Sequence, residues 1–265
     1  MLTEPARAPA RFLDIDFDAG TYRQASVDLD HLSRRDVFSF VVTPNVDHVL
    51  MLHPKSPTPA TLDFQQAYAA AAMRLCDSRI LQRLARLHGV KLDVVTGSDL
   101  TARLFQNGQL DGRKVAIIGG DAEMVHELLG RFPAVHIVQH QPPMGVLEKP
   151  SAADEIIAFI EQEQANYVLL AIGAPQSEII AHKCLLAGKS VGVGFCIGAS
   201  IEFLLDRKRR APRWMQRMSL EWAFRLLSEP RRLWRRYLVT GPRILLLAAC
   251  WRWPSAEARP NRHVN

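Results

Sequence analysis

The chain has 265 residues, of which 48% are hydrophobic and 23% are charged, a balance that allows a globular protein with a sizeable core. The formal net charge of +6 is unevenly distributed, because thirteen Lys or Arg residues and only two acidic residues lie between Arg207 and Trp253. All five tryptophans lie in the same segment. A mildly acidic body therefore carries a basic, tryptophan-rich tail.

No stretch of the sequence is typical of a membrane span or of a secretory leader. The longest candidate span, residues 244–251, is far shorter than the roughly 20 residues that a transmembrane helix requires. Prolines and charges interrupt residues 1–17, where a leader would need a continuous apolar run. The four cysteines show neither paired nor metal-like spacing, so we expect buried thiols in a reducing cytoplasm.

The first predicted element is an edge strand within residues 13–20. Asp14, Asp16 and Asp18 alternate there with apolar residues, as in a half-exposed strand. Three acids at this spacing resemble the start of a calcium loop, but the remaining ligands of such a loop are missing. The nine histidines show no ligand spacing either. We therefore expect no metal site and no cofactor.

Apolar, mostly β-branched runs then alternate with helical patterns along the body. The strand-like runs are residues 38–44, 115–120, 135–140, 167–173 and 190–195. The helical patterns lie near residues 60–73, 78–88, 98–107, 121–131, 151–164 and 176–187. Strands that are apolar on both faces and separated by helices predict an α/β, Rossmann-like fold with a mostly parallel sheet covered by helices. The composition changes near residue 206, so we predict a catalytic domain at residues 1–206 and a basic helical appendage at residues 207–265.

Glycines and small polar residues follow four of these strands, at the sheet edge where α/β proteins bind ligands. They are Thr43 and Asn45, Gly119 and Gly120, Gly173 and Gln176, and the segment from Gly194 through Gly198 to Ser200. Gly-rich turns let the backbone approach a phosphate and point helix N-terminal N–H groups at it. Several such turns in one sheet predict a nucleotide or nucleotide-sugar site. The phosphate-loop motif G-x-x-x-x-G-K-[ST] and a first-unit G-x-G-x-x-G are absent.

Asp77 has two interpretations on the sequence pattern. It follows the apolar segment 67–76 and precedes the helical pattern at 78–88, which is typical of a helix N-cap. A carboxylate at the same place, beside a nucleotide-type crevice, is equally well placed as a general base. The pattern leaves both roles open.

A set of ordered motifs resembles the WecG/TagA/CpsF family of bacterial glycosyltransferases, glycosyltransferase family 26. The resemblance runs over roughly residues 10–245 and is specific, because the R-A-P, E-W-x-x-R and E-P-x-R signatures occur together and in order. Its segments are TPN (43–45), Asp77, VVTGSDL (94–100), VAIIGGDAE (115–123), IGAPQSE (172–178), VGVGFCIGASIEF (191–203), KRRAPRWMQRMSLEW (208–222) and FRLLSEPRRLWRRY (224–237).

The resemblance implies a membrane-associated, metal-independent, inverting enzyme. Such an enzyme moves a hexose or N-acetylhexosamine-type sugar from a UDP-sugar to a polyprenyl-diphosphate-linked acceptor, for teichoic acid, common antigen, capsule or exopolysaccharide. By position, Asp77 would be the base that deprotonates the acceptor hydroxyl. Residues lining the same pocket would be Thr43, Asn45 and Gln176. Arginines that neutralise a diphosphate would be Arg225, Arg232 and Arg235.

Two departures from the family pattern lie near the expected pocket. Ser78, followed by Arg79, stands where the family usually has Gly after its catalytic Asp. Ile201-Glu202 replaces the usual Phe-Asp after the last Gly-rich turn. The sugar and the acceptor are therefore not carried over from the resemblance.

The tail is predicted to form two or more short amphipathic helices. Pro230 should interrupt a single long helix, and Ser228 is predicted to cap the second one. Arginines and tryptophans on amphipathic helices suit an anionic bilayer surface. A nucleic-acid module would leave the acidic, nucleotide-type body unexplained, so we expect no nucleic-acid partner. A tail that only packs its tryptophans onto the body is the structural alternative.

The sequence thus predicts a cytoplasmic enzyme that is peripherally bound to the inner face of the bacterial cell membrane. Two alternative functions stay open at this point. One is a non-catalytic nucleotide-sugar-binding protein on the same scaffold, and the other is an α/β nucleotide-dependent oxidoreductase. A homo-oligomer is also compatible with the sequence.

Overall fold

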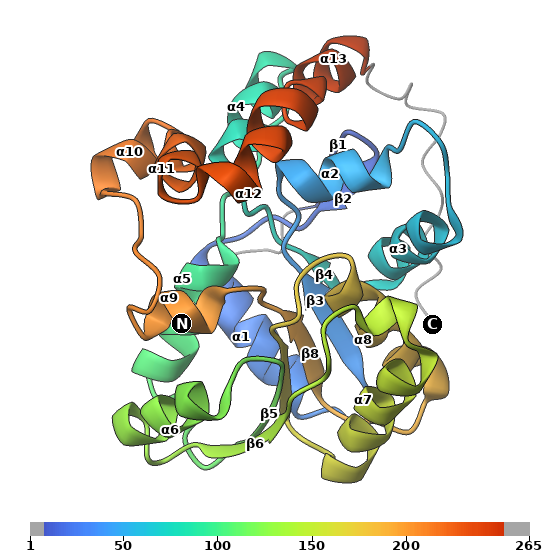
Figure 1. Ribbon diagram of the computed structural model, residues 1–265, viewed down its shortest axis with the longest axis vertical. Coiled ribbons are helices and arrows are strands. Elements are labelled where there is room, and N and C mark those ends of the chain that lie inside the picture. The colour runs from blue at the N-terminus through green and yellow to red at the C-terminus, as the bar shows by residue number, and fades with distance from the viewer. Residues whose placement is uncertain (1–7, 252–265) are drawn as a thin grey trace.

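A computed structural model describes residues 8–251 and shows a six-stranded sheet between two layers of helices (Figure 1). The strand order is β4-β3-β8-β7-β5-β6, and all neighbouring strands are parallel. The strands are β3 (Ser39–Val42), β4 (Met73–Arg74), β5 (Lys114–Ile118), β6 (His136–His140), β7 (Tyr167–Leu170) and β8 (Val193–Cys196). The predicted Rossmann-like α/β fold is confirmed.

Alternating side chains of the strands enter two separate cores, one on each face of the sheet. In β5, Ala116 and Ile118 enter one core, whereas Val115 and Ile117 enter the other. Both sets are fully buried, as expected for a parallel sheet that is covered on both faces. The helices of the first face are α2 (Val46–Leu52), α3 (Pro59–Ala70), α7 (Pro150–Glu163) and α8 (Gln176–Ala187).

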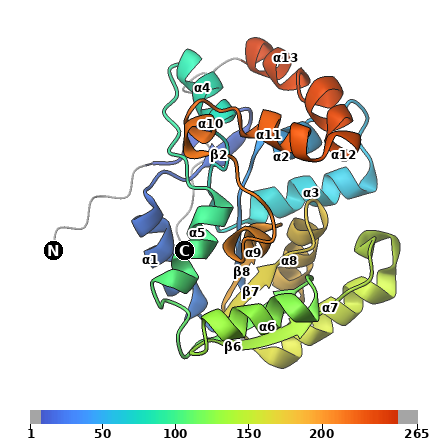
Figure 2. The ribbon, with the colours of Figure 1, turned by 60° about the vertical axis from the view of Figure 1, so that its left-hand side comes forward.

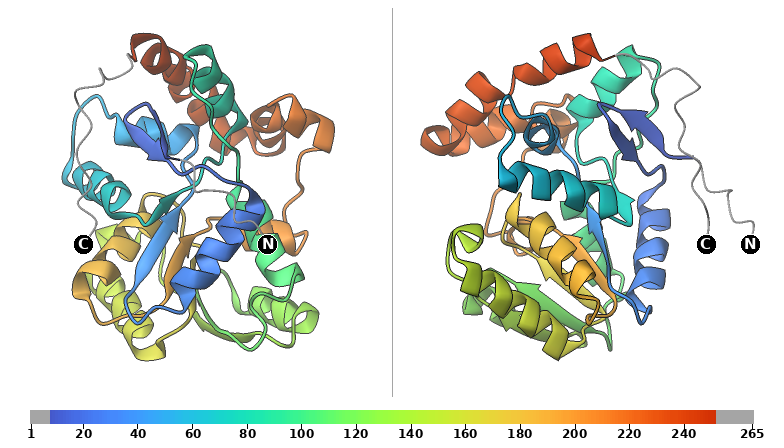
Figure 3. Two further views of the ribbon diagram at one scale, coloured as in Figure 1. Left: turned by 180° about the vertical axis from the view of Figure 1, so that it is seen from behind. Right: turned by 90° about the vertical axis from the view of Figure 1, so that its right-hand side faces the viewer.

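The second face is covered by α1 (Tyr22–Ser33), α5 (Gly97–Gln106), α6 (Ala122–Arg131) and α9 (Ser200–Leu204). Figure 3 shows the sheet between these two layers. A short 3₁₀ turn, η1 (Val146–Glu148), precedes α7. Several helices begin at the polar residues that the turns supply: Thr21, Asn45, Thr58, Ser78, Thr96 and Asp121 accept a hydrogen bond from the first turn.

A small antiparallel hairpin lies outside the main sheet and contains the predicted edge strand. It pairs β1 (Ala10–Phe12) with β2 (Ile15–Phe17). Its acids interact with arginines: Asp14 and Asp16 lie 3.7 and 3.5 Å from the Arg11 guanidinium, and Asp18 accepts the backbone N–H of Arg74. Among residues 8–251, no group of three or more His, Cys, Asp or Glu side chains is placed to hold a metal ion.

The sequence pattern did not predict β4, α1 or α2. The strand β4 has two residues and lies inside an alanine-rich run that continues the helical pattern of α3, so neither length nor alternation marks it. It forms because it pairs with β3, with Val41 opposite Met73 and Val42 opposite Arg74. Long-range pairing therefore overrides local propensity at this edge of the sheet.

The C-terminal part forms a series of short helices that lie over α2 and α4 (Arg79–Leu87) (Figures 1 and 2). They are α10 (Arg213–Arg217), α11 (Glu221–Ser228), α12 (Pro230–Trp234), the π-helical turn η2 (Arg235–Thr240) and α13 (Arg243–Cys250). Pro230 is the first residue of α12, as predicted. Ser228 does not cap α12; it ends α11 and donates to the carbonyl of Phe224.

These C-terminal helices are packed onto the body, which limits their freedom. Ile244 and Ala248 of α13 are buried in the core that contains α2 and α4. Trp251 meets Phe12 of the hairpin edge to face, with ring centroids 5.0 Å apart. At least one tryptophan thus serves packing, while Trp253 lies outside the described residues. The division at residue 206 stays a prediction.

Candidate active site

A cavity of about 450 Å³ lies between the carboxyl ends of β3 and β4 and the C-terminal helices. The body supplies Asn45, Val46, Asp47, Asp77, Ser78, Arg79, Ile80, Thr96 and Asp99 to its wall. The C-terminal helices supply Gln216, Ser219, Glu221, Trp222, Arg225, Arg236, Tyr237, Leu238, Gly241, Pro242, Ile244 and Leu245. The cavity therefore depends on both parts of the chain. A second hollow, of about 440 Å³, lies beside Asp30 and Arg113 at the amino ends of the strands, away from these residues.

Asp77 is fixed in the cavity wall by backbone pairing on both sides. Its N–H donates to the carbonyl of Pro44 at 2.9 Å, which extends the β3–β4 ladder. Cys76 bridges to Val94 on the other side. The N-cap of α4 is Ser78, whose hydroxyl accepts the N–H of Leu81 at 3.2 Å. The N-cap interpretation of Asp77 is therefore wrong, and the departure from Gly at position 78 supplies the cap.

The environment of Asp77 opposes its negative charge. Burial is the main cause that raises the pKa of this carboxyl to about 7, and the nearby carboxylate of Glu221 raises the pKa further. Arg225, the backbone N–H of Gly97 and Arg210 act in the opposite direction. A carboxyl that titrates near neutral pH can accept a proton and still be ionised in a large fraction of molecules.

Thr43 and Asn45 follow β3, as predicted, but both make structural contacts. Asn45 lines the cavity and caps α2, with its side-chain oxygen 2.9 Å from the N–H of Asp47. Thr43 is buried next to the cavity, and its hydroxyl donates to the carbonyl of Cys196 at 3.4 Å. Thr43 therefore supports the floor of the site, whereas Asn45 is exposed to the cavity.

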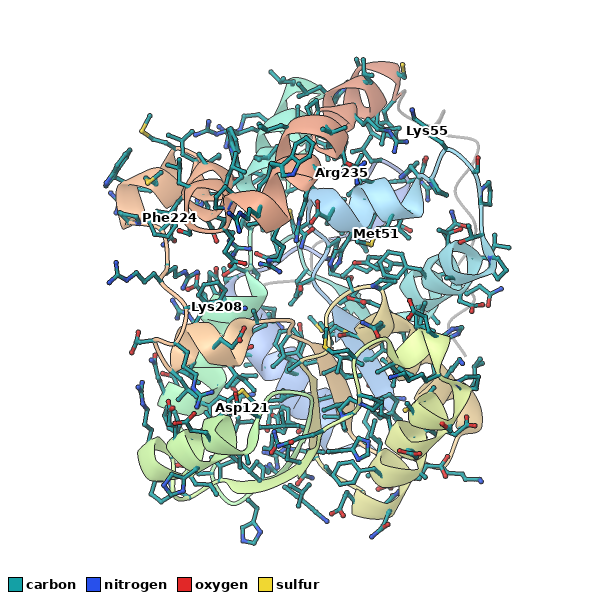
Figure 4. All side chains as sticks on the ribbon, viewed as in Figure 1. Met51, Lys55, Asp121, Lys208, Phe224 and Arg235 are labelled. Atoms are coloured by element: carbon teal, nitrogen blue, oxygen red, sulfur yellow. The ribbon has the colours of Figure 1, made fainter. Side chains whose placement is uncertain are left out.

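The structure separates the three predicted arginines. Arg225 lines the cavity, where it pairs with Glu221 at 2.5 Å and stacks on Phe203. Arg232 points away, is largely exposed and pairs with Glu229. Arg235 is exposed and lies against the ring of Trp234, on the upper part of the molecule in Figure 4.

Arg236, the neighbour of the arginine that the resemblance indicated, lines the cavity instead. Its guanidinium pairs with Asp47 at the start of α2, and its Nε is buried without a hydrogen-bond partner. The π-helical turn η2 begins here, and in it the N–H of Gly241 donates to the carbonyl of Arg236, five residues back. The motif pointed to this pair of arginines, but only the structure shows which one reaches the cavity.

The predicted glycines lie outside this cavity. Gly119, Gly120, Gly173 and Gly198 occupy turns at the carboxyl edge of the sheet with positive φ angles, which glycine adopts without strain. Gly194 was expected at a strand end but lies inside β8, where an added Cβ would be 2.7 Å from Phe38. Packing therefore explains why this position has no side chain, and the nucleotide-binding role of all five glycines stays a prediction.

Two polar residues at the same edge already have structural partners. Gln176 accepts the N–H of Val146 at 2.7 Å and donates to the carbonyl of Ile172 at 3.3 Å, so it ties down η1. Asp121 caps α6, and each of its two carboxylate oxygens also lies 2.9 Å from the same nitrogen of Arg207. Figure 4 shows Asp121 well separated from Arg235 and Phe224 on the C-terminal helices.

A buried polar cluster lies close to Asp77, behind α2. His48 and Tyr68 are hydrogen-bonded at 2.5 Å, and Glu178 lies 3.9 Å from His48. Burial lowers the pKa of His48 to about 4 and raises that of Glu178 to about 7, so the cluster is largely uncharged in mildly acidic solution. Neither histidine spacing nor the IGAPQSE motif indicated this group.

Replacing Asp77 should change stability in a pH-dependent way. The carboxyl titrates near 3.9 in an unfolded chain and near 7 in the folded protein, so the stability that it contributes falls as the pH rises through this window. Asp77→Asn cannot ionise. Its free energy of unfolding should therefore exceed that of the wild type by about 1–3 kcal/mol at pH 8. This difference in stability should vanish toward pH 4.

Urea denaturation between pH 4 and pH 8.5 measures this difference. The exposed Asp36→Asn is the control, since it removes a carboxyl from the amino-end side of the sheet. A stability difference that stays constant with pH would contradict the raised pKa of Asp77.

One known protein family matches this chain. The family described as glycosyl transferase WecG/TagA/CpsF matches residues 10–258, which is nearly the whole chain and includes both the sheet and the C-terminal helices that form the cavity. The chain therefore belongs to the WecG/TagA/CpsF family of glycosyl transferases.

Proposed function

We propose that the protein is an inverting, metal-independent glycosyltransferase with Asp77 as its general base. It would transfer a hexose or N-acetylhexosamine-type sugar from a UDP-sugar to a polyprenyl-diphosphate-linked acceptor in cell-surface polysaccharide synthesis. The observation that carries the proposal is the Asp77 carboxyl, with its pKa near 7, in the wall of a cavity that also contains Arg225 and Arg236.

The chemistry requires one base and a means of stabilising the leaving group. Asp77 takes the proton of the acceptor hydroxyl while the hydroxyl oxygen forms a bond to the anomeric carbon of the donor. The bond from this carbon to the diphosphate oxygen breaks on the opposite face, and its electron pair leaves with UDP. One displacement of this kind inverts the anomeric centre and needs no second carboxylate as nucleophile.

Arg225 and Arg236 are the groups that we assign to the diphosphate. Both line the cavity and each is held by one carboxylate, Glu221 and Asp47 respectively. Guanidinium groups bind phosphate oxygens with two parallel hydrogen bonds, and this positive charge can take the place of a metal ion at a departing diphosphate. The unpartnered Nε of Arg236 supports its assignment.

The outer surface of the C-terminal helices supports a peripheral membrane position at the inner face of the cell membrane. Large apolar side chains are exposed there next to arginines, and those outside the cavity wall are Trp214, Met218, Leu227, Trp234, Val239 and Leu246. Arg231, Arg232 and Arg235 are exposed on the same helices. Within residues 8–251, no helix is long and apolar enough to span a bilayer. Such a surface suits anionic lipid headgroups, where a polyprenyl-linked acceptor would be found.

Loss of the base should abolish transfer without abolishing donor binding. We expect Asp77→Asn to lower the rate of transfer by roughly 10²–10⁴-fold, because it cannot accept the proton. UDP-sugar binding, measured by calorimetry with a donor panel, should change by less than about threefold. The wild-type rate should rise with pH and level off above about pH 7.

Near-wild-type transfer by Asp77→Asn would refute the assignment of Asp77 as the general base. Donor binding without any transfer in the wild type would favour the non-catalytic alternative. Binding of NAD in place of UDP would favour the oxidoreductase.

The two cavity arginines should differ from their exposed neighbours in donor binding. Arg225→Gln and Arg236→Gln each remove charged hydrogen bonds, so we expect UDP affinity to fall about 10- to 100-fold. Arg232→Gln and Arg235→Gln should change it less than about threefold, since both side chains lie outside the cavity. Equal losses at all four positions in a titration with UDP would show that the assignment of Arg236 is wrong.

Binding to lipid should depend on the exposed apolar residues. Sedimentation with anionic liposomes should retain the wild type, and neutral liposomes should retain much less of it. The double variant Val239→Ser, Leu246→Ser should lower the bound fraction at least several-fold, because it removes two exposed side chains that lie outside both the core and the cavity wall. Leu186→Ser, which changes an equally exposed residue of the body, is the control. Unchanged binding of the double variant would refute docking through η2 and α13.

A further inference from the structure

The first turn of α5 lies beside the Asp77 carboxylate. Thr96 is the N-cap of this helix and Gly97 its first residue, and the backbone N–H of Gly97 lowers the pKa of Asp77. The Cβ that any other residue would carry at position 97 would lie 3.3 Å from Thr43. The orientation of this helix start therefore decides how strongly its free N–H groups favour the ionised carboxylate.

A network of side chains fixes that helix start. The hydroxyl of Thr96 accepts the N–H of Asp99 at 3.2 Å and donates to its carboxylate at 2.9 Å. The hydroxyl of Tyr22 accepts the N–H of Thr96 at 3.1 Å and donates to Asp99 at 3.0 Å. Tyr22 thus connects α1 to the first turn of α5.

Arg210, from the segment between α9 and α10, completes the network. Its guanidinium lies 2.5 Å from the Asp99 carboxylate and 3.2 Å from the hydroxyl of Ser98. It is half-buried, and its charge lowers the pKa of Asp77. One arginine therefore contacts the helix start from outside and acts electrostatically on the base.

The flanking segment is held so that Arg210 reaches this place. Arg207 pairs with Glu127 at 2.7 Å on α6, and Arg131 of α6 donates to the carbonyls of Leu204 and Leu205. On the other side, the amide of Gln216 in α10 donates to the carbonyl of Ala211 at 2.7 Å. Figures 2 and 4 show this segment running from α9 past Lys208 to α10. The C-terminal helices and the base thus share one anchoring point.

We propose that Arg210 is a positioning residue, which couples docking of the C-terminal helices to the Asp77 carboxylate through Asp99 and the first turn of α5. This inference rests on the proposed function of Asp77. It predicts that the base is correctly oriented and ionised only when the segment that leads into α10–α13 is in place. Closing of the cavity and activation of the base are then one event.

Several other charged or titratable groups face Asp77. Glu221 and Arg225 act on it from α11, in opposite directions. Burial is the main cause that raises the pKa of Tyr68 on α3 and of the neighbouring Cys76, and the Asp77 charge adds to both. These groups are unchanged in the Arg210 variants, so a change that depends on Arg210 is separable from them.

The titration of Asp77 can be measured without a substrate. The melting temperature of each variant is compared with that of the same variant carrying Asp77→Asn, and the pH at which the difference levels off reports the Asp77 pKa. In Arg210→Gln this pH should move up by about half to one unit. The substitution removes a positive charge near Asp77 and also loosens the first turn of α5, whose N–H groups favour the ionised carboxylate. Arg210→Lys should restore most of the shift. Arg209→Gln, which removes the neighbouring exposed charge, should leave the pH unchanged.

Tyr22→Phe tests the mechanical part of the coupling without altering any charge. It removes the hydroxyl that bonds Thr96 and Asp99, so the pH should again move up. This variant also keeps the proposal testable if Arg210→Gln fails to fold. In transfer assays, Arg210→Gln should lower kcat about three- to tenfold at pH 6, with a smaller loss at pH 8.5 and little change in KM.

The two proposals fail in distinguishable ways. Equal titration of Asp77 in Arg210→Gln, Arg209→Gln and wild type would overturn the positioning role, whatever the activity. A uniform loss of stability without a shift in the Asp77 pKa would also overturn it. A third outcome is that Arg210→Gln shifts the Asp77 pKa while Asp77→Asn still transfers sugar. That outcome would leave the coupling intact and refute the role of Asp77 as the base.

Discussion

The site depends on one carboxylate, that of Asp77, which lies beside a helix start at a place where burial disfavours its charge. Burial and Glu221 oppose ionisation of Asp77, whereas the N–H of Gly97 and two arginines favour it. This balance places the titration near neutral pH. Because Arg225 and Arg210 come from beyond α9, the body alone does not set the balance. The C-terminal helices thus contribute to the acidity of the base as well as to the walls of the cavity.

Three arginines at the site each have an acidic partner. Arg225 pairs with Glu221, Arg236 with Asp47, and Arg210 with Asp99. Paired in this way, the guanidinium groups can be partly buried around a cavity of about 450 Å³ without a large desolvation cost. The same pairing fixes their orientation, so that a bound diphosphate meets donors that are already in position.

Much of the architecture could be predicted from the sequence, because buried parallel strands and their covering helices have strong patterns. The strands β5 to β8 and helices α3 to α8 lie close to the expected ranges. The features that were missed depend on contacts between distant residues. The two-residue strand β4 exists only through pairing with β3, and the absence of a side chain at Gly194 is required by Phe38, which lies just before β3. The sequence position of Asp77 indicated either a helix cap or a general base. Only the structure shows that Ser78 caps the helix and that Asp77 lines the cavity. The motif indicated the pair at 235–236, and only the packing of the C-terminal helices shows that Arg236 lines the cavity.

The π-helical turn η2 has a consequence for how this end of the chain can vary in length. A π turn holds one residue more than the α-helical turn it replaces, so deleting one residue between 235 and 240 would restore regular α-helical winding. Because the wide turn takes up its extra residue locally, the helices on either side would keep their relative orientation, with α13 still anchored in the core by Ile244 and Ala248. This end of the chain can therefore lose one residue without turning α12 against α13, and the cavity wall on either side of the turn is retained.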